Sequence, residues 1–97
     1  MSTLHVLSHS PFDDQRLHSC LRLLGQDDAI LLSGDAVYAV TPGSQPWEAL
    51  ARAGVAVFAL AEDVQARALP GNAQVELLDY PAFVELTLAY EKVNSWL

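Results

Sequence analysis

The chain has 97 residues, with five Lys plus Arg against twelve Asp plus Glu and a formal net charge of −7. This length predicts one domain over residues 1–97. An acidic chain repels phosphate, so we expect no direct contact with nucleic acid or with an anionic membrane. Apolar residues make up 52% of the chain, above the usual range of about 45–50%. This surplus predicts a face that another subunit covers.

The cysteine content and the first residues indicate a compartment. Cys20 is the one cysteine, which excludes an internal disulfide and fits a reducing environment. The opening MSTLHVLSHS has no Lys or Arg and no apolar stretch typical of a signal peptide. No window approaches the roughly 20 apolar residues of a membrane span. The sequence therefore predicts a cytoplasmic protein.

The first third of the chain predicts a strand and then a helix. Thr3–Leu7 is a short, partly β-branched run that ends in polar residues, which is typical of a strand. Asp13 or Asp14 is placed to cap the following helix, and Gly25 to end it in a left-handed turn. One apolar helical stripe connects these signals, formed by Leu17, Cys20, Leu21 and Leu24.

The middle of the chain predicts a buried strand and a second helix. Residues 29–33 form an unbroken apolar run up to Leu32, which suits a strand covered on both faces. A turn at Gly34 and Asp35 follows. Residues 36–40 read equally well as a short strand or as a helical turn. Residues 46–52 predict a helix that begins near a proline and ends before Gly54.

The last third of the chain repeats the alternation. Residues 55–60 predict a third strand, residues 62–69 a short helix and residues 74–78 a fourth strand. Asp79 is placed to cap a last helix that has Pro81 in its first turn. Strands that alternate with helices through short loops predict a three-layer α/β/α sandwich around a mainly parallel sheet of four or five strands.

Cys20 is the candidate sulfur nucleophile. A reactive thiol needs a cation, a histidine or a helix N-terminus nearby to lower its pKa. Cys20 instead falls in the middle of the apolar stripe, which predicts a buried structural thiol whose pKa is raised. The alternative is a thiol exposed at the rim of the domain that carries sulfur.

The other polar residues offer weak sites. His5, His9 and His18 could bind a metal, but no cluster of Cys or His supports them, so we expect no metal site. The sequence also lacks the glycine-rich and cysteine-pair motifs of cofactor sites, which predicts no cofactor. His9 and Asp35 follow predicted strands, at the edge where parallel sheets bind ligands. A small-ligand module is therefore one hypothesis, while Asp35 reads more simply as a turn cap.

Several segments taken together resemble the TusB/DsrH family, the B-type subunits of sulfur-relay complexes. The resemblance runs from about Leu4 to Trp96, and it is carried by LHVLSHSP, RLLGQDDAILLSGDAVYAV, FALAEDVQARAL and DYPAFVELTLAYEKVNSW. The most specific patterns are EDxxARxL, which begins at Glu62, and DYxxFVxL, which begins at Asp79.

The resemblance implies a DsrE-like fold and a set of partners. Family members assemble with C-type and D-type subunits into a heterohexamer. The relay passes persulfide sulfur to the D-type subunit, then to an E-type acceptor, and it ends in 2-thiolation of the tRNA wobble uridine. The main reactive cysteine of the family is on the D-type subunit, so the resemblance implies a positioning role for this chain.

Two alternatives stay open at this point. Some similar chains carry a cysteine in the first helix, so this chain could be a sulfurtransferase in its own right through a Cys20 persulfide. It could also serve dissimilatory sulfur oxidation, as related complexes do. Whether it is an enzyme is therefore undecided. Val37, Tyr38 and Trp96 are the predicted interface residues, because large aromatic side chains commonly anchor such contacts. For Trp96, a clamp on its own domain is an equally good interpretation.

Overall fold

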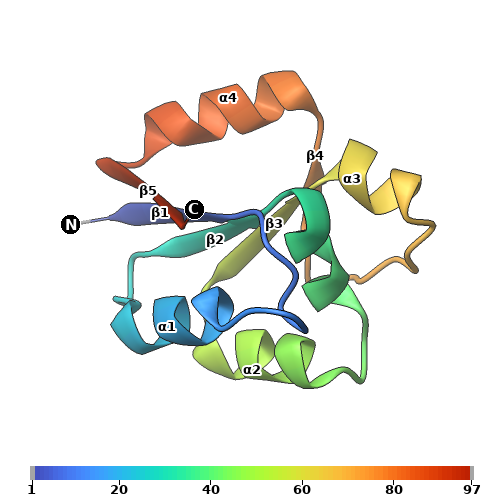
Figure 1. Cartoon of the computed structure of the whole chain (residues 1–97). Helices are drawn as coiled ribbons and strands as arrows, with labels where there is room; N and C mark the ends of the chain where they lie inside the picture. Colours follow the sequence, from blue (N-terminus) through green and yellow to red (C-terminus); the bar gives the residue numbers. More distant parts are fainter. Residues whose placement is uncertain (1, 97) are drawn as a thin grey trace.

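The computed structural model describes residues 2–96 and contains one parallel sheet of five strands (Figure 1). The strand order is β4-β3-β2-β1-β5, and every neighbouring pair runs parallel. The strands are β1 (Thr3–Leu7), β2 (Ala29–Leu32), β3 (Ala56–Leu60), β4 (Glu76–Leu78) and β5 (Lys92–Trp96). The prediction of an α/β/α sandwich with a mainly parallel sheet is confirmed.

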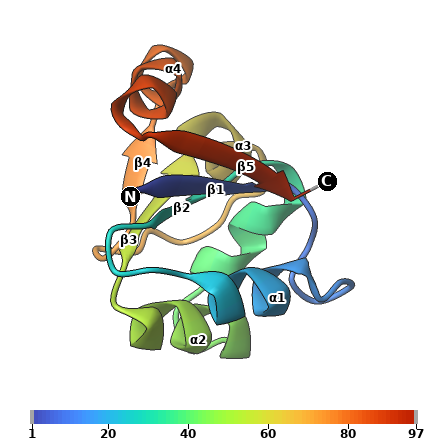
Figure 2. The same cartoon turned by 90° about the vertical axis from the view of Figure 1, so that its left-hand side faces the viewer.

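The helices are divided unequally between the two faces of this sheet. Helices α1 (Arg16–Leu23) and α2 (Gln45–Ala53) cover one face, and α4 (Tyr80–Ala89) lies on the other (Figures 1 and 2). The 3-10 helix η1 (Gly34–Val40) and α3 (Ala61–Ala66) follow the carboxyl ends of β2 and β3. Two layers of apolar side chains result, one on each side of the sheet.

The larger core lies between the sheet and helices α1 and α2. All four residues of β2 are buried, as an apolar strand covered on both faces should be. Alternate residues of β2 point to opposite sides, so Ile30 and Leu32 join the larger core and Ala29 and Leu31 the smaller one. The smaller core packs against α4 through Ala82, Phe83, Leu86 and Tyr90.

Capping side chains and a glycine mark the ends of α2 and the start of α4. Ser44 caps α2 by accepting the Trp47 N–H at 3.3 Å, and Gly54 ends that helix in the left-handed region at φ +70°. Asp79 caps α4, as predicted, by accepting the Ala82 N–H at 2.9 Å. These contacts satisfy amide groups that the first turn of a helix leaves unpaired.

The first helix departs from its predicted ends. Helix α1 begins at Arg16, and no side chain caps it in the usual way. Asp14 instead accepts the Arg16 N–H at 2.7 Å and pairs with the Arg16 guanidinium. The predicted left-handed turn at Gly25 is wrong, because the chain already leaves the helix in an extended conformation at Leu24.

Two segments that the sequence left undecided are settled by the structure. Residues 36–40 belong to η1, so the helical alternative is confirmed. The tail around Trp96 is the fifth strand, and it pairs with β1 from Thr3↔Lys92 to Leu7↔Trp96. The first and last strands of the described chain are therefore neighbours (Figure 2).

Candidate functional site

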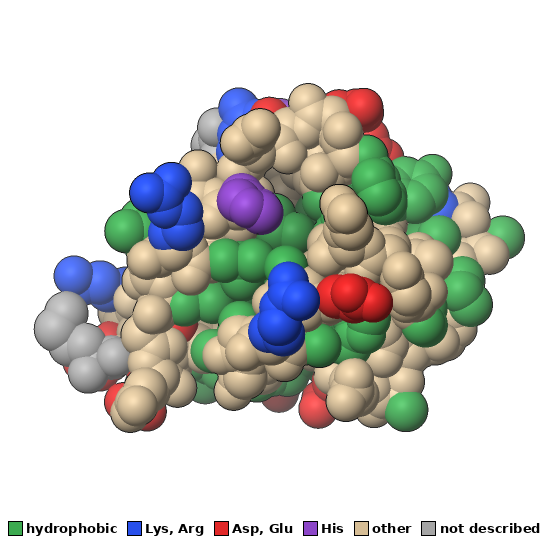
Figure 3. Space-filling model, turned by 90° about the horizontal axis from the view of Figure 1, so that it is seen from below, with side chains coloured by type: hydrophobic (Ala, Val, Ile, Leu, Met, Phe, Trp, Pro, Cys, Tyr) green, Lys and Arg blue, Asp and Glu red, His purple; other side chains and the backbone are tan. Residues whose placement is uncertain are grey.

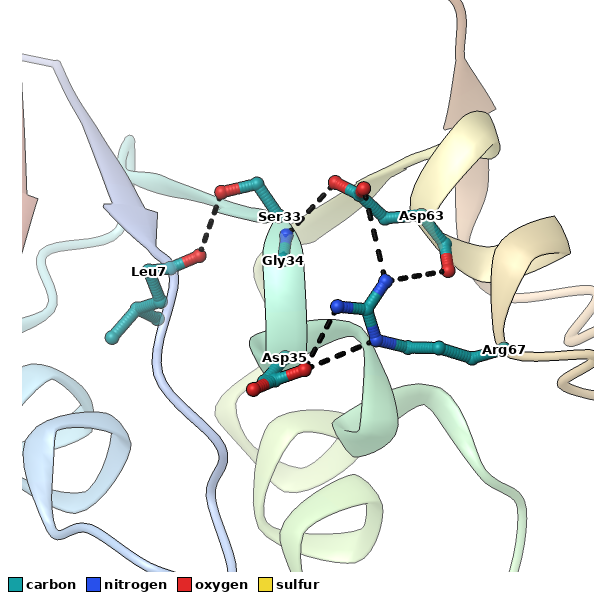
Figure 4. Close-up of polar contacts among 6 residues, drawn as sticks. All are labelled: Leu7, Ser33, Gly34, Asp35, Asp63 and Arg67. Carbon is teal, nitrogen blue, oxygen red and sulfur yellow. Dashed lines mark hydrogen bonds and ion pairs between the residues drawn. The ribbon is translucent and has the colours of Figure 1, made fainter.

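Polar residues at the carboxyl ends of β1 and β2 are tied together by hydrogen bonds (Figure 4). The Ser33 amide and hydroxyl both donate to the Leu7 carbonyl, at 2.9 and 3.2 Å. The next amide, that of Gly34, donates to the Asp63 carboxylate at 2.8 Å. Because Asp63 lies in α3, this contact connects the end of β2 to the helix that follows β3.

Arg67 joins the two carboxylates at this edge (Figure 4). Its Nε and Nη2 both donate to Asp35 Oδ1, at 3.2 and 2.8 Å. Its Nη1 donates to the Asp63 carbonyl at 3.1 Å and lies 3.8 Å from Asp63 Oδ1. The guanidinium also lies over the Tyr38 ring, 5.8 Å from the ring centre. The EDxxAR pattern therefore builds a clamp between η1 and α3.

This edge holds few groups that are free for chemistry. Asp35 is exposed but paired with Arg67, so it does not act as the turn cap that the sequence predicted. His9 is exposed and lies 3.5 Å from the Ser8 hydroxyl. No hydrogen bond or ion pair between His9 and Asp35 occurs within residues 2–96. The structure thus does not bring His9 and Asp35 together, and the charged groups that do converge at this edge pair with one another.

A glycine is needed at position 34 because the backbone there adopts a left-handed conformation that other residues disfavour. Its φ is +51°, and a Cβ there would lie 3.2 Å from the Ser8 carbonyl oxygen. We expect Gly34→Ala to lower the free energy of unfolding by about 1–2 kcal/mol, because side chains disfavour this conformation. Urea unfolding followed by circular dichroism measures the loss. Gly71→Ala is the matched control, because a Cβ at Gly71 meets open space, and an equal loss in both variants would contradict the argument.

Cys20 lies at the inner side of α1. Its side chain is 0% exposed and belongs to the larger core. Burial raises the pKa of the thiol from 9.0 to about 12, and the negative charge of Asp28 adds to the rise. The structure thus gives Cys20 the surroundings of the buried structural thiol and not those of a reactive one.

A polar triad, which shares no residue with the clamp, is formed by His5, Asp28 and Trp96. His5 in β1 has its Nε2 3.2 Å from Asp28 Oδ2 and accepts a hydrogen bond from Trp96 Nε1 at its Nδ1, at 3.1 Å. An indole N–H can only donate, so Nδ1 of His5 carries the lone pair and Nε2 carries the proton that Asp28 accepts. Asp28 also accepts the amides of Gly25 and Thr3, at 2.9 and 3.0 Å.

The three histidines do not come together. His5 is buried in this triad, whereas His9 and His18 are exposed. Within residues 2–96, no group of three or more His, Cys, Asp or Glu side chains could hold a metal ion. Within residues 2–96, the three histidines of the metal hypothesis therefore do not form a set of metal ligands.

The Trp96–His5 hydrogen bond fixes the last strand to the sheet. We expect Trp96→Phe to lower the free energy of unfolding by about 1–3 kcal/mol, because the buried Nδ1 of His5 loses its donor. Chemical denaturation measures the effect, with Ser95→Ala as the control at an exposed neighbour in the same strand. A stability unchanged by Trp96→Phe would show that this bond contributes nothing.

The predicted interface residues are used largely inside the chain itself. Val37 is completely enclosed in the larger core, so it has no surface to offer a partner and that part of the interface prediction is corrected. Tyr38 and Trp96 are half-buried, one under Arg67 and the other against His5. Sequence reasoning placed the apolar surface here because it could not tell which apolar run the fold would cover.

The exposed apolar surface lies mainly elsewhere. The large exposed apolar residues are Phe12, Leu23, Leu77, Tyr80, Val84, Leu88 and Val93. Three of them belong to α4, whose sequence is apolar on every side. This apolar character was the sequence signal that could have located the exposed apolar surface, because a helix that is apolar on every side is normally buried. No helix within residues 2–96 is long and apolar enough to cross a membrane.

The face formed by α1 and α2 has a different character. Apolar side chains along its middle are surrounded by acidic, basic and histidine side chains (Figure 3). A cleft of about 620 Å³ opens here between residues 11–18 and the start of α2, and Phe12, Asp13, Asp14 and His18 are among the residues that line it. Its carboxylates make it unsuited to anionic ligands.

The fold defines the class of protein. The structure superimposes on the ychN protein of Escherichia coli with a TM-score of 0.78 and 23% identity, over 99% of this chain and 100% of that chain. A Methanobacterium thermoautotrophicum protein of unknown function gives a TM-score of 0.65 and 15% identity, over 96% of each chain. The chain thus has a DsrE-like α/β/α fold.

Sequence comparison then places the chain within that class. The model of the family described as DsrH like protein matches residues 9–93. Protein TusB of Enterobacter sp. strain 638 is 37% identical over 96% of this chain and 99% of its own length. Protein TusB of Escherichia coli strain K12 is 38% identical over the same shares. The chain belongs to the DsrH-like family, and the predicted TusB/DsrH resemblance is confirmed.

Proposed function

We propose that this chain is the positioning subunit of a cytoplasmic sulfur relay that serves 2-thiolation of the tRNA wobble uridine. It assembles with C-type and D-type subunits in a heterohexamer, and it helps the D-type subunit to deliver sulfur to an E-type acceptor. Membership of the DsrH-like family and the TusB relatives support a role in the relay. This chain's own residues support the proposal that it positions other subunits and does not carry sulfur itself.

The observation that carries the positioning role is the environment of Cys20. Sulfur transfer through a persulfide needs a thiolate that a donor can reach. The one cysteine of this chain is 0% exposed, and its pKa is raised to about 12. No other side chain type forms a persulfide, so the chain has no accessible sulfur carrier of its own in this conformation. A subunit without a sulfur-carrying thiol contributes to the relay through its contacts with the other subunits.

Co-expression with C-type and D-type partners tests the proposal. The three chains should co-purify, and intact-mass measurement after incubation with a sulfur donor should show added sulfur on the D-type chain and none on this one. The complex that carries Cys20→Ala should transfer sulfur at the wild-type rate. A sulfur adduct on Cys20, or a chain that binds neither partner, would overturn the proposal.

A cellular experiment tests the pathway. Deleting the gene for this chain should remove most 2-thiouridine from tRNA, measured by mass spectrometry of digested nucleosides. Expression of the wild type or of Cys20→Ala from a plasmid should restore it equally. Unchanged 2-thiouridine in the deletion strain would separate this chain from the tRNA pathway.

A further inference from the structure

Helix α4 is an apolar element that residues 2–96 cover on one side only. It runs from Tyr80 to Ala89, and Glu85 is its one charged residue. A helix that is apolar on every side is normally enclosed by protein. No residue of α4 is buried, however, and helices α1 and α2 lie on the opposite face of the sheet (Figure 2). Residues 2–96 therefore leave the outer side of this helix exposed.

The two sides of α4 have different partners. Ala82, Phe83 and Leu86 pack on the sheet as part of the smaller core. The opposite side carries Tyr80, Val84 and Leu88, spaced four residues apart, which places them in one stripe. Their exposed fractions are 59%, 44% and 81%. The stripe lies on the outer side of α4, and its Tyr80 ring also contacts the Phe83 ring edge-on, with the ring centres 5.6 Å apart.

The charges near the stripe in the sequence are mostly acidic. Residues 76–92 contain the four acids Glu76, Asp79, Glu85 and Glu91 and one base, Lys92. A two-fold contact between copies of this chain would place these acids opposite one another, which is unfavourable. A complementary partner carries basic side chains around an apolar centre. The charge pattern therefore selects a different chain over a second copy.

We propose that the stripe of Tyr80, Val84 and Leu88 docks into an apolar groove, bordered by Lys and Arg, on a different subunit of the relay. The inference rests on the proposed function for the identity of that subunit. Phe12 and Leu23 are also exposed, but the face that carries α1 and α2 has charged side chains of both signs around its apolar middle (Figure 3).

The apolar part of the contact is tested by the double variant Val84→Asp with Leu88→Asp. Replacing these two central apolar side chains by charged ones should weaken binding to the purified C- and D-type partners by about 100-fold or more. Isothermal titration calorimetry measures the affinity. Leu23→Asp is the matched control, because Leu23 is equally exposed but lies on α1, and its affinity should stay within about twofold. Thermal unfolding of each variant confirms that it folds.

The charge of the partner is tested by Glu85→Lys. Against a basic rim, this reversal should weaken binding by about 3- to 10-fold at low salt, with less effect at high salt. Equal or tighter binding would overturn the basic rim. The variant adds no apolar change, so it separates the charge argument from the packing argument.

The outcomes distinguish the two proposals. If the wild-type chain binds neither partner, the proposed function fails. If it binds and the Val84 and Leu88 variant binds equally well, the complex stands and the α4 contact is wrong. If the double variant abolishes self-association of the purified chain but leaves the mixed complex intact, the stripe serves a second copy, and this inference is overturned.

Discussion

Cys20 in the folded chain should react with a thiol reagent about 1000-fold more slowly than in the unfolded chain, because a pKa near 12 leaves little thiolate at pH 8. Burial in the core adds a second barrier, since the reagent cannot reach a side chain that is 0% exposed. Reaction with Ellman's reagent, followed at 412 nm in buffer and in about 6 M guanidinium chloride, measures the ratio.

A control variant gives the rate of an accessible thiol on the same chain. Cys20→Ala combined with Ser19→Cys moves the thiol to an exposed position one residue away on α1, and it should react at a rate near that of the unfolded chain. Comparable rates for Cys20 and for the relocated thiol would mean that the core opens readily. The sulfurtransferase hypothesis for this chain would then regain its basis.

Asp28→Ala should lower the free energy of unfolding by about 3 kcal/mol, because hydrogen bonds to a charged group are each worth about 1.5–3 kcal/mol and the donors would lose their acceptor. The Asp28 carboxylate accepts from the amides of Gly25 and Thr3 and from the His5 ring, and so it joins the loop after α1 to the first strand. Urea unfolding at pH 7 measures the loss. Asp27→Ala, at the exposed neighbouring position, should change stability by less than about 0.5 kcal/mol.

The same carboxylate predicts how stability depends on pH. The Gly25 amide is the main cause that holds the pKa of Asp28 below its ordinary value, and the His5 and Thr3 hydrogen bonds add to it. A lowered pKa stabilises the fold fully above the unfolded value of about 3.9, and this contribution is lost as the pH falls through the folded value. The stability difference between the wild type and Asp28→Asn should therefore be constant from pH 7 to about pH 5 and should shrink below about pH 4. A difference that grows on acidification would contradict this assignment.

Local signals in the sequence were sufficient for much of the fold. The apolar run at residues 29–32, the Asp79 cap and the glycine at position 54 each act through near neighbours, and the structure has the strand, the cap and the left-handed helix end. The Asp63–Arg67 pair is also local, since the two side chains are one helical turn apart. Such features can be predicted because their partners are adjacent in sequence.

The features that were missed depend on residues far apart in the chain. Asp28 reaches back to Thr3 and His5, and Trp96 reaches His5 across nearly the whole sequence. No periodicity marks such pairs, so the tail read as a terminal segment and not as a strand. Val37 failed as an interface residue for a related reason: its run is as apolar as a surface patch would be, and only the packing of η1 shows that it is inside.

The pairing of β5 with β1 has a consequence during protein synthesis. β1 is made first, and one of its sides stays unpaired until residues 92–96 have left the ribosome. An open strand edge can pair with other chains, so β5 protects this side of β1 once it has formed. Loss of β5 by proteolysis should therefore reduce the yield of folded protein far more than the small size of that strand suggests.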